Sequence, residues 1–310
     1  MKKLLIFVCV AVTFCGCMPR DKNGKFLDTP TSGTITIAVD EALQPLMEAE
    51  ISAFTALYAN AHINAIYISE GEAIDSLLVD SVRLAVVTRK LVKEEEDYLE
   101  TLRLPAAQVR VAINGIALIV HPDNPDTLMT TDQLKQILTG ELKQWNELNK
   151  SSRKAPINVV FDQPNSGIIR FLNDSLTSLK NLPENVFAVK SNAAVVDYVS
   201  SHPEALGLID VSWISDRDDA TTNTFLGSVK VVGLSTGGEY YKPFQAYLSQ
   251  RQYPLLRDVY MISREGRTGL ATGFTAFVAS DKGQRVVLKS GLVPATMPVR
   301  IVEINRTPFK

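Results

Sequence analysis

The stretch "QVRVAINGIALIVH", from Gln108 to His121, is one long apolar run that is interrupted only at Asn114-Gly115. An average strand has about 5–6 residues, so this run is much longer than one strand of an ordinary sheet needs. A length of this kind favours a strand that leaves one sheet and enters another. We therefore expect the chain to cross here between two parts of the molecule.

The sequence before this run alternates between strand-like and helix-like patterns. Residues 34–40, 62–69 and 83–88 are rich in β-branched residues and predict strands. A helix is expected directly after the first strand, where Asp40 is a plausible N-cap and Pro45 lies in the first turn. Strand, helix, strand, helix, strand is the order of a parallel α/β sheet.

The same alternation continues after the long run. Thr130 and Gln133 form a capping-box pattern, which predicts a helix that Gly140 ends. Further strands and helices are expected in five segments: 156–162, 192–210, 228–234, 253–263 and 269–280. The segment 253–263 predicts a returning strand, and 269–280 predicts an apolar helix. The expected fold class is therefore α/β.

Length and charge limit the classes of function. The chain has 310 residues, of which 45% are hydrophobic, so it can form a large core and, by default, two domains. Its 32 basic and 34 acidic residues give a net charge of −2, and no Lys/Arg block stands out. Nucleic acid is therefore not an expected partner.

The N-terminus has the pattern of an export signal. Two lysines precede an apolar run that ends in Phe14-Cys15-Gly16-Cys17, and the run is shorter than the about 20 residues that span a bilayer. The ending resembles a bacterial lipobox, which predicts lipid attachment at Cys17 and an extracytoplasmic protein anchored to a membrane. A plain cleaved signal or an uncleaved anchor are the alternatives. Residues 18–33 are expected to form a tether.

Motifs of catalysis are nearly absent. All three cysteines lie in the signal segment 1–17, so the mature chain has no thiol nucleophile. His62, His121 and His202 are widely separated, and no zinc-protease, nucleophile-elbow or phosphate-loop motif occurs. We therefore expect no enzyme, no catalytic residue, no metal site and no cofactor.

Three turns, each between an expected strand and an expected helix, are candidate ligand sites. They are Asp40-Glu41-Ala42, Thr88-Arg89 and Asn165-Ser166-Gly167. In open α/β sheets, ligands bind beyond the carboxyl ends of the strands. The third turn could offer backbone N–H groups to an anion, whereas the neighbouring Asp162 would repel one. Ordinary capping is the alternative role for all three turns.

The segment "VAINGIALIVHPDNPDTLMTTDQLKQILTGELKQWNEL" (111–148) resembles the signature stretch of PstS-like phosphate-binding proteins, the solute receptors of phosphate ABC transporters. Asn114-Gly115-Ile116, Asn124-Pro125, Ile137-Leu138-Thr139-Gly140 and Trp145 carry this resemblance in order. It implies a type II periplasmic-binding-protein fold, in which two α/β lobes, each with a mixed, mainly parallel sheet, close over a ligand.

The resemblance also implies the division of the chain and its partners. Lobe 1 is expected to comprise residues 34–115 and 258–310, and lobe 2 residues 116–257. The implied ligand is phosphate or a related small solute. The implied macromolecular partner is an ABC-type permease or another envelope complex, and the membrane is contacted through the lipid anchor only. We expect a monomer.

The family's ligand loops map onto ten positions of this sequence. These positions are Asp40, Glu41, Ala42, Glu70, Thr88, Arg89, Asn165, Ser166, Gly167 and Ile168. The hydroxyl and the arginine of the third family loop are kept as Thr88 and Arg89, and Ser166-Gly167 are kept in the fourth.

Several of the mapped loops carry acids where the family has other residues. Carboxylates replace hydroxyls in the first loop and in the second, where the acids are Glu70 and Glu72; Arg83 replaces an aspartate, Asp162 an arginine and Ile168 a threonine. A carboxylate about 4 Å from a phosphate charge costs about 4 kcal/mol at an effective dielectric of 20. The acids therefore cannot all face a bound phosphate.

Three hypotheses follow from this pattern. In the first, the chain is a receptor for phosphate or a related solute in ABC-type uptake. In the second, the acids select a cationic or zwitterionic ligand. In the third, the chain keeps the fold, has lost the solute site and acts as an interaction protein in an envelope complex.

Overall fold

The structure is a computed structural model that describes residues 28–300 except 180, 217 and 267. The expected signal segment with Cys17 lies outside the described residues, as does most of the expected tether. Among the residues that are described, no helix has both the length and the apolar character needed to cross a membrane.

The expected α/β fold class is confirmed by a curled mixed sheet of ten strands, eight of which follow the order β2-β1-β3-β11-β4-β8-β6-β7. Their bounds are β1 Gly33–Asp40, β2 Ala61–Ile68, β3 Leu84–Val87, β4 Ala107–Val120, β6 Asn158–Phe161, β7 Val186–Ala188, β8 Ala205–Asp210 and β11 Leu256–Ser263. The short strands β9 (Lys230–Val231) and β12 (Val293–Pro294) pair with β4, and β5 (Leu128–Thr130) pairs with β10 (Gly233–Ser235).

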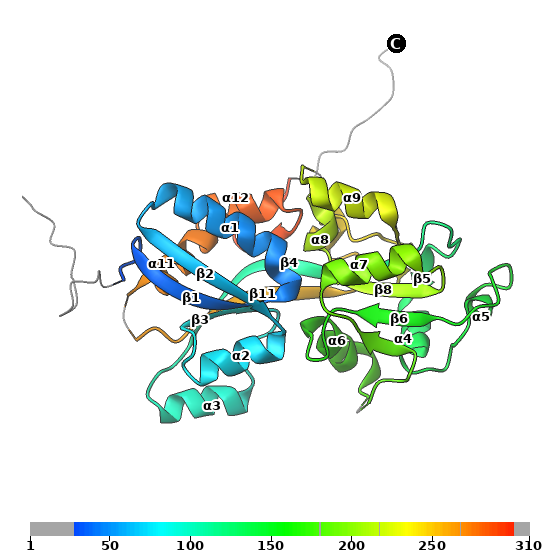
Figure 1. The fold of residues 1–310 in the computed structure, drawn as a ribbon, viewed down its shortest axis with the longest axis horizontal. Coiled ribbons are helices and arrows are strands. Elements are labelled where there is room, and N and C mark those ends of the chain that lie inside the picture. Colours follow the sequence, from blue (N-terminus) through cyan, green and yellow to red (C-terminus); the bar gives the residue numbers. More distant parts are fainter. Residues whose placement is uncertain (1–27, 180, 217, 267, 301–310) are drawn as a thin grey trace, which may run out of the picture.

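Helices cover both faces of this sheet (Figure 1). They are α1 Gln44–Leu57, α2 Glu70–Leu78, α3 Lys93–Thr101, α4 Thr131–Leu138, α5 Trp145–Leu148, α6 Gly167–Leu172, α7 Asn192–Ser201, α8 Ser212–Ser215, α9 Ala220–Ser228, α10 Gln245–Ser249, α11 Leu270–Ala279 and α12 Asp281–Lys289. A 3₁₀ turn, η1 (Glu41–Leu43), precedes α1, and a π-helical segment, η2 (Asn173–Thr177), follows α6.

Strand β4 is the long crossing strand that the sequence predicts. Its first part, residues 107–115, pairs with β11, and its second part, residues 116–120, pairs with β8. At Gly115, between the two parts, a Cβ atom would lie 3.1 Å from Leu248 Cδ2 and 3.2 Å from Val211 Cγ2. The absence of a side chain at Gly115 therefore lets β4 pack closely against the segments that carry Leu248 and Val211.

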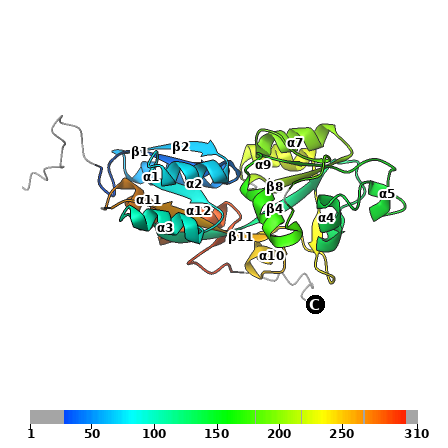
Figure 2. The same ribbon diagram turned by 90° about the horizontal axis from the view of Figure 1, so that it is seen from below.

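The sheet has two halves that lie side by side, with β4 and β11 between them (Figure 2). We call the half built on β1, β2 and β3 the first lobe, and the half built on β6, β7 and β8 the second lobe. Strands within each of these sets are parallel, and their pairings with β11 or β4 are antiparallel. The exact lobe boundaries stay a prediction.

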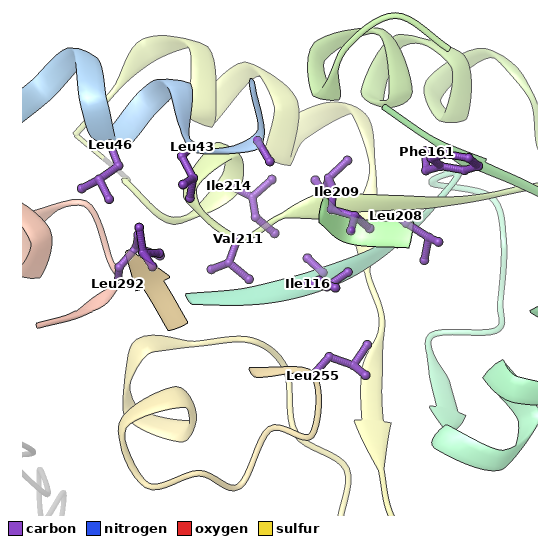
Figure 3. Packing of buried hydrophobic residues seen from close by; sticks show 14 of the residues in the cluster. Leu43, Leu46, Ile116, Phe161, Leu208, Ile209, Val211, Ile214, Leu255 and Leu292 are labelled. Atoms are coloured by element: carbon purple, nitrogen blue, oxygen red, sulfur yellow. The ribbon is translucent and has the colours of Figure 1, made fainter. Parts of the chain in front are cut away.

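The hydrophobic core continues through the junction of the lobes. Leu43 and Leu46 from the start of α1 lie beside Val211 and Ile214 of the second lobe, near Ile116 of β4 (Figure 3). All five side chains are buried. Because apolar burial is the main favourable term in folding, this contact stabilises the arrangement in which the lobes meet.

The structure also confirms local signals that were read from the sequence. Thr130 Oγ1 accepts from Gln133 N at 3.1 Å and Gln133 Oε1 accepts from Thr130 N at 2.8 Å, which completes the capping box of α4. Asp40 Oδ1 accepts from Ala42 N at 3.2 Å, so Asp40 caps the 3₁₀ turn η1, whereas α1, which the sequence expected it to cap, begins after Leu43 without a side-chain cap.

Six helices of the described chain were not predicted from the sequence: α3, α5, α8, α9, α10 and α12. Helix α3, "KEEEDYLET", buries only Leu99, so it has no apolar stripe that would reveal it. Helix α12 is formed by polar residues over most of its surface and buries only Gly283, Gln284 and Val287. Both helices lie on the outside of the first lobe, where a helix needs few apolar residues (Figure 1).

A buried acid in α1 gives a prediction on stability. Glu50 is fully buried, and within the described residues neither carboxylate oxygen has a hydrogen-bond partner, so burial raises its pKa from 4.5 to about 9. The unfolded carboxyl loses its proton near pH 4.5 and the native one keeps it up to about pH 9. Glu50 should therefore lower the free energy of unfolding progressively between these values, by about 1.4 kcal/mol per pH unit.

Urea unfolding of residues 18–310 at several pH values measures this effect. We expect Glu50→Gln to gain stability relative to the parent chain as the pH rises from 5 to 8. The control is Glu48→Gln, which removes an exposed acid from the same helix. A stability difference between Glu50→Gln and the parent chain that does not change with pH would contradict the assignment.

Candidate functional site

Polar side chains meet where the parallel strands of both lobes end. Asp40 is the last residue of β1 and Asp210 of β8, while Thr88 follows β3 and Asp162 follows β6. The buried polar residues at this place, which we call the junction cluster, are Asp40, Glu41, Glu70, Thr88, Asn114, Asp162, Ser166, Asn192, Asp210 and Arg257. This is the position at which open α/β sheets bind ligands.

Glu70, the first residue of α2, has the densest set of donors in the cluster. Its Oε1 accepts from the backbone N of Thr88 at 2.8 Å and from the hydroxyl of Thr88 at 2.5 Å. The guanidinium of Arg170, on α6 of the second lobe, donates to both oxygens. Burial acts to raise the pKa of Glu70, but Arg170 and these hydrogen bonds outweigh burial and hold it below 4.5.

Side chains of the first lobe press against the start of α6. A Cβ atom on Gly167 would lie 2.7 Å from Asp40 Oδ2, 2.9 Å from Thr88 Oγ1 and 3.0 Å from Glu70 Cδ. Only glycine fits at this position without displacing one of them. The structure thus brings the turns at Asp40, Thr88 and Gly167, which the sequence singled out separately, into direct proximity.

A buried ion pair lies beside this contact. Arg257 Nη2 donates to Asp210 Oδ2 at 2.5 Å, and the exposed fractions of the two side chains are 1% and 0%. Arg257 Nη1 also donates to Thr88 Oγ1 at 3.3 Å. Asn114 Nδ2 lies 2.7 Å from both oxygens of Asp210, so β4, β8 and β11 are joined by one polar network.

Asn192, at the start of α7, connects the remaining acids. The Glu41 carboxylate accepts from Asn192 N at 3.2 Å and from Nδ2 at 2.7 Å. The same Nδ2 donates to Asp162 Oδ2 at 3.3 Å, and Asn192 Oδ1 accepts from Asp210 N at 2.9 Å. Burial raises the pKa of Glu41 to about 7, and the hydrogen bonds from Asn192 oppose this shift.

Burial acts against ionisation of two further acids in the cluster. Burial and the nearby charge of Glu70 raise the pKa of Asp40 well above 3.8, and burial raises that of Asp162. Each of these carboxyl groups is therefore harder to ionise than an exposed aspartate. Two ion pairs complete the site: Glu70 with Arg170, and Asp210 with Arg257. Both guanidinium groups are therefore paired with a carboxylate.

Two carboxyl oxygens of the cluster form no hydrogen bond with the described residues. Asp40 Oδ2 and Asp162 Oδ1 are buried and have no hydrogen-bond partner among the described residues. Asp40 therefore reaches the start of α6 with an oxygen that forms no hydrogen bond there. For buried polar atoms this is unusual, because an unsatisfied buried group costs free energy.

An open cleft of about 660 Å³ leads from the surface to this cluster, between α2 and α6. It is lined by Glu70, Gly71, Asp75, Arg89, Pro164, Asn165, Ser166, Ile169, Arg170, Asn173, Leu179, Asn181 and Leu182. Asn165 is exposed at its edge, where its carbonyl accepts from Gly71 N at 3.4 Å. Within the described part of the chain, no group of His, Cys, Asp or Glu is arranged to hold a metal ion.

Other residues that were singled out from the sequence have different surroundings. Arg89 lines the cleft, but its guanidinium pairs with Glu95 at 2.7 Å. Arg83 pairs with Asp28 at 2.7 Å, and Glu72 is exposed and accepts from Ser69 N at 3.1 Å, which completes the capping box of α2.

Ala42 and Ile168 contribute backbone atoms rather than side-chain contacts. The Ala42 carbonyl accepts from Ser212 Oγ and from Trp213 Nε1, each at 3.1 Å, across the lobe junction. Ile168 is buried, and its N donates to Ser166 Oγ at 3.0 Å. A ligand role for any of the ten mapped positions stays a prediction.

Sequence reasoning missed five polar residues of the site: Asn114, Arg170, Asn192, Asp210 and Arg257. Arg257 is a cation within the strand-like run "YPLLRDVYMIS", and Asp210 ends the apolar run "ALGLID". A charge at such a place is the available signal, because a buried charge is rarely found without a partner. The identity of each partner could not be read from the sequence.

Comparisons with known proteins agree with this fold. A family model described as a PBP superfamily domain matches residues 26–282. The phosphate-binding protein PstS of Bacillus subtilis is 26% identical over 270 residues, which cover 86% of this chain and 82% of that protein. PstS of Borreliella burgdorferi is 23% identical over 305 residues, covering 94% and 99%.

The fold is also that of solved structures. A phosphate ABC transporter substrate-binding protein from Clostridium perfringens, solved with bound phosphate, superposes with a TM-score of 0.73 at 24% identity and covers 85% of this chain and 100% of that one. Since the family model spans most of the chain, this protein belongs to the PBP superfamily domain family and has the two-lobe fold of PstS-like phosphate-binding proteins.

Proposed function

We propose that this chain is an extracytoplasmic solute-binding protein, anchored to a membrane through a lipid on Cys17, and not an enzyme. It takes phosphate or a related small solute between its lobes and delivers it to an ABC-type permease. The single observation that carries this proposal is the convergence of Thr88, Arg170 and Arg257 at the lobe junction. These donors come from both lobes and point to one buried place.

The donor set suits an oxyanion. A backbone N–H and a hydroxyl, both of Thr88, and the guanidinium of Arg170 already hold one carboxylate. Phosphate offers the same kind of acceptor oxygen with more negative charge. Charge-assisted hydrogen bonds in a site of low dielectric are strong, so the same donors can supply much of the binding free energy for phosphate.

Closure of the lobes fits the same role. Hydrogen bonds join Glu41 to Asn192, Glu70 to Arg170 and Ala42 to Trp213, in each case across the junction. A solute that contacts both lobes stabilises the closed state over an open one. A permease can then distinguish the loaded protein from the empty one by its shape.

A second candidate ligand is a cationic or zwitterionic solute. The observation that favours it is the pair of unengaged buried oxygens, Asp40 Oδ2 and Asp162 Oδ1. An ammonium group could donate the hydrogen bonds that these two oxygens lack. A thermal-shift screen tests this candidate: an amino acid or polyamine that raises the melting temperature where phosphate does not would favour it. If neither raises it, a solute-independent envelope partner becomes the better hypothesis.

Phosphate binding is tested by isothermal titration of residues 18–310. We expect saturable binding with a dissociation constant in the micromolar range, and weaker binding at higher salt because the contact is electrostatic. Thr88→Val removes the hydroxyl and should weaken binding by about tenfold or more, since a hydrogen bond to a charged group contributes roughly 1.5–3 kcal/mol.

Thr101→Val, which changes an exposed threonine on α3 in the same way, is the matched control and should bind like the parent chain. Melting curves of both variants establish that they are folded. If the folded parent chain shows no binding at millimolar phosphate, phosphate is not its ligand. If Thr88→Val binds phosphate with unchanged affinity, phosphate does not bind at Thr88.

The lipid anchor gives a separate prediction. If Cys17 carries the lipid, Cys17→Ser should move the full-length chain from the membrane fraction to the soluble fraction of cells. Cys15→Ser, which changes a cysteine two residues earlier, serves as the control and should stay with the membrane. Membrane association of the Cys17→Ser protein would refute lipid attachment at that residue.

A further inference from the structure

We propose that the Glu70 carboxylate occupies the anion position of the interlobe site, and that phosphate binds there only by displacing it. Residue 70 would then set the affinity and specificity of the site. This inference rests on the proposed function, because it assumes that the cluster around Thr88 and Arg170 is where an oxyanion is held.

The contacts of Glu70 support this role. Its carboxylate accepts a backbone N–H at 2.8 Å and a hydroxyl at 2.5 Å from Thr88 of the first lobe, together with the guanidinium of Arg170 from the second lobe. Glu70 is 1% exposed, although it is an ionised acid. A helix cap does not require this: Ser69 and Glu72 already complete the capping box of α2.

The donors cannot serve two acceptors at once. Thr88 has one amide hydrogen and one hydroxyl hydrogen, and both are directed to Glu70 Oε1. On the side of α6 the space next to the carboxylate is also limited, because a Cβ atom on Gly167 would already lie 3.0 Å from Glu70 Cδ. An incoming phosphate that used these donors would have to take the place of the carboxylate.

Electrostatics gives the same result. A phosphate next to the Glu70 carboxylate would add a repulsion of about 4 kcal/mol per pair of unit charges at 4 Å and an effective dielectric of 20. Arg170 cannot offset this fully, because it also pairs with Asp174 at 3.0 Å. Simultaneous occupation by the carboxylate and phosphate is therefore unfavourable.

The structure provides a place for the displaced side chain. Glu70 lines the open cleft of about 660 Å³ that leads to the surface, and Arg89 lines the same cleft. Rotation of the Glu70 side chain would carry its carboxylate into this cleft without breaking the capping box of α2. Displacement then needs a change of one side chain and no refolding of the backbone.

The experiment compares phosphate titrations of residues 18–310 and three variants. Glu70→Ala removes the internal competitor and should tighten phosphate binding at least tenfold. Glu70→Gln keeps the shape and one acceptor oxygen but removes the charge, so its affinity should lie between those of the parent chain and Glu70→Ala. The matched control is Glu100→Ala, which removes an exposed acid from α3 that does not line the cleft; we expect a change of less than twofold.

Circular dichroism and melting curves identify any variant that fails to fold. If Glu70→Ala does not fold, Glu70→Gln decides, and it must still bind more tightly than the parent chain. Equal or weaker binding by the folded Glu70 variants overturns the inference, while binding by the parent chain keeps the proposed function. Binding by Glu70→Ala but not by the parent chain supports the inference and rules out phosphate as the natural solute. If none of the folded chains binds phosphate, the inference and the proposed phosphate ligand are both rejected.

Discussion

The ion pair between Arg257 and Asp210 connects the three strands on which the architecture depends. Arg257 is on β11, Asp210 ends β8, and Asn114 on β4 donates to the same carboxylate. Both charged side chains are almost completely buried. Removing one partner of such a pair leaves an uncompensated charge in the interior and typically costs 3–5 kcal/mol. The pair therefore fixes how the crossing strand β4 meets both lobes.

The other polar contacts at the junction are arranged around this pair. Thr88 accepts a hydrogen bond from Arg257 and donates one to Glu70, and Glu70 in turn binds Arg170 of the second lobe. The lobes are thus held together by a chain of hydrogen bonds that runs from Arg257 through Thr88 and Glu70 to Arg170. A hydrogen-bonded network of this kind in a buried place favours one arrangement of the lobes.

The acids of the junction explain how this protein differs in chemistry from a simple anion receptor. Burial raises the pKa of Asp40 and Asp162, whereas Arg170 lowers that of Glu70, and Asp210 forms a buried ion pair with Arg257. The positive charge that could attract an anion is in this way already balanced inside the protein. An anion can therefore bind only if it interacts with these cations more strongly than the internal carboxylates do.

The sequence by itself determined the fold class and singled out turns that lie together in the candidate site. The length of the run 108–121, the strand and helix alternation and the capping residues Thr130, Gln133 and Asp40 are local signals, and local signals survive in the structure. The turns at Asp40, Thr88 and Ser166, which were separate candidates in the sequence, lie together in the structure, because the carboxyl ends of parallel strands share one edge of a sheet.

Only the tertiary structure decided which side chains pair. Glu70 and Arg170 are 100 residues apart in the chain, and Arg257 and Asp210 are 47 apart, so no local pattern connects them. Arg89, one of the mapped ligand positions, lines the cleft and pairs with Glu95, six residues away. The charge of an acid can be read from the sequence. Whether that acid repels an anionic ligand or occupies the ligand's position depends on which hydrogen-bond donors lie next to the acid in the folded protein.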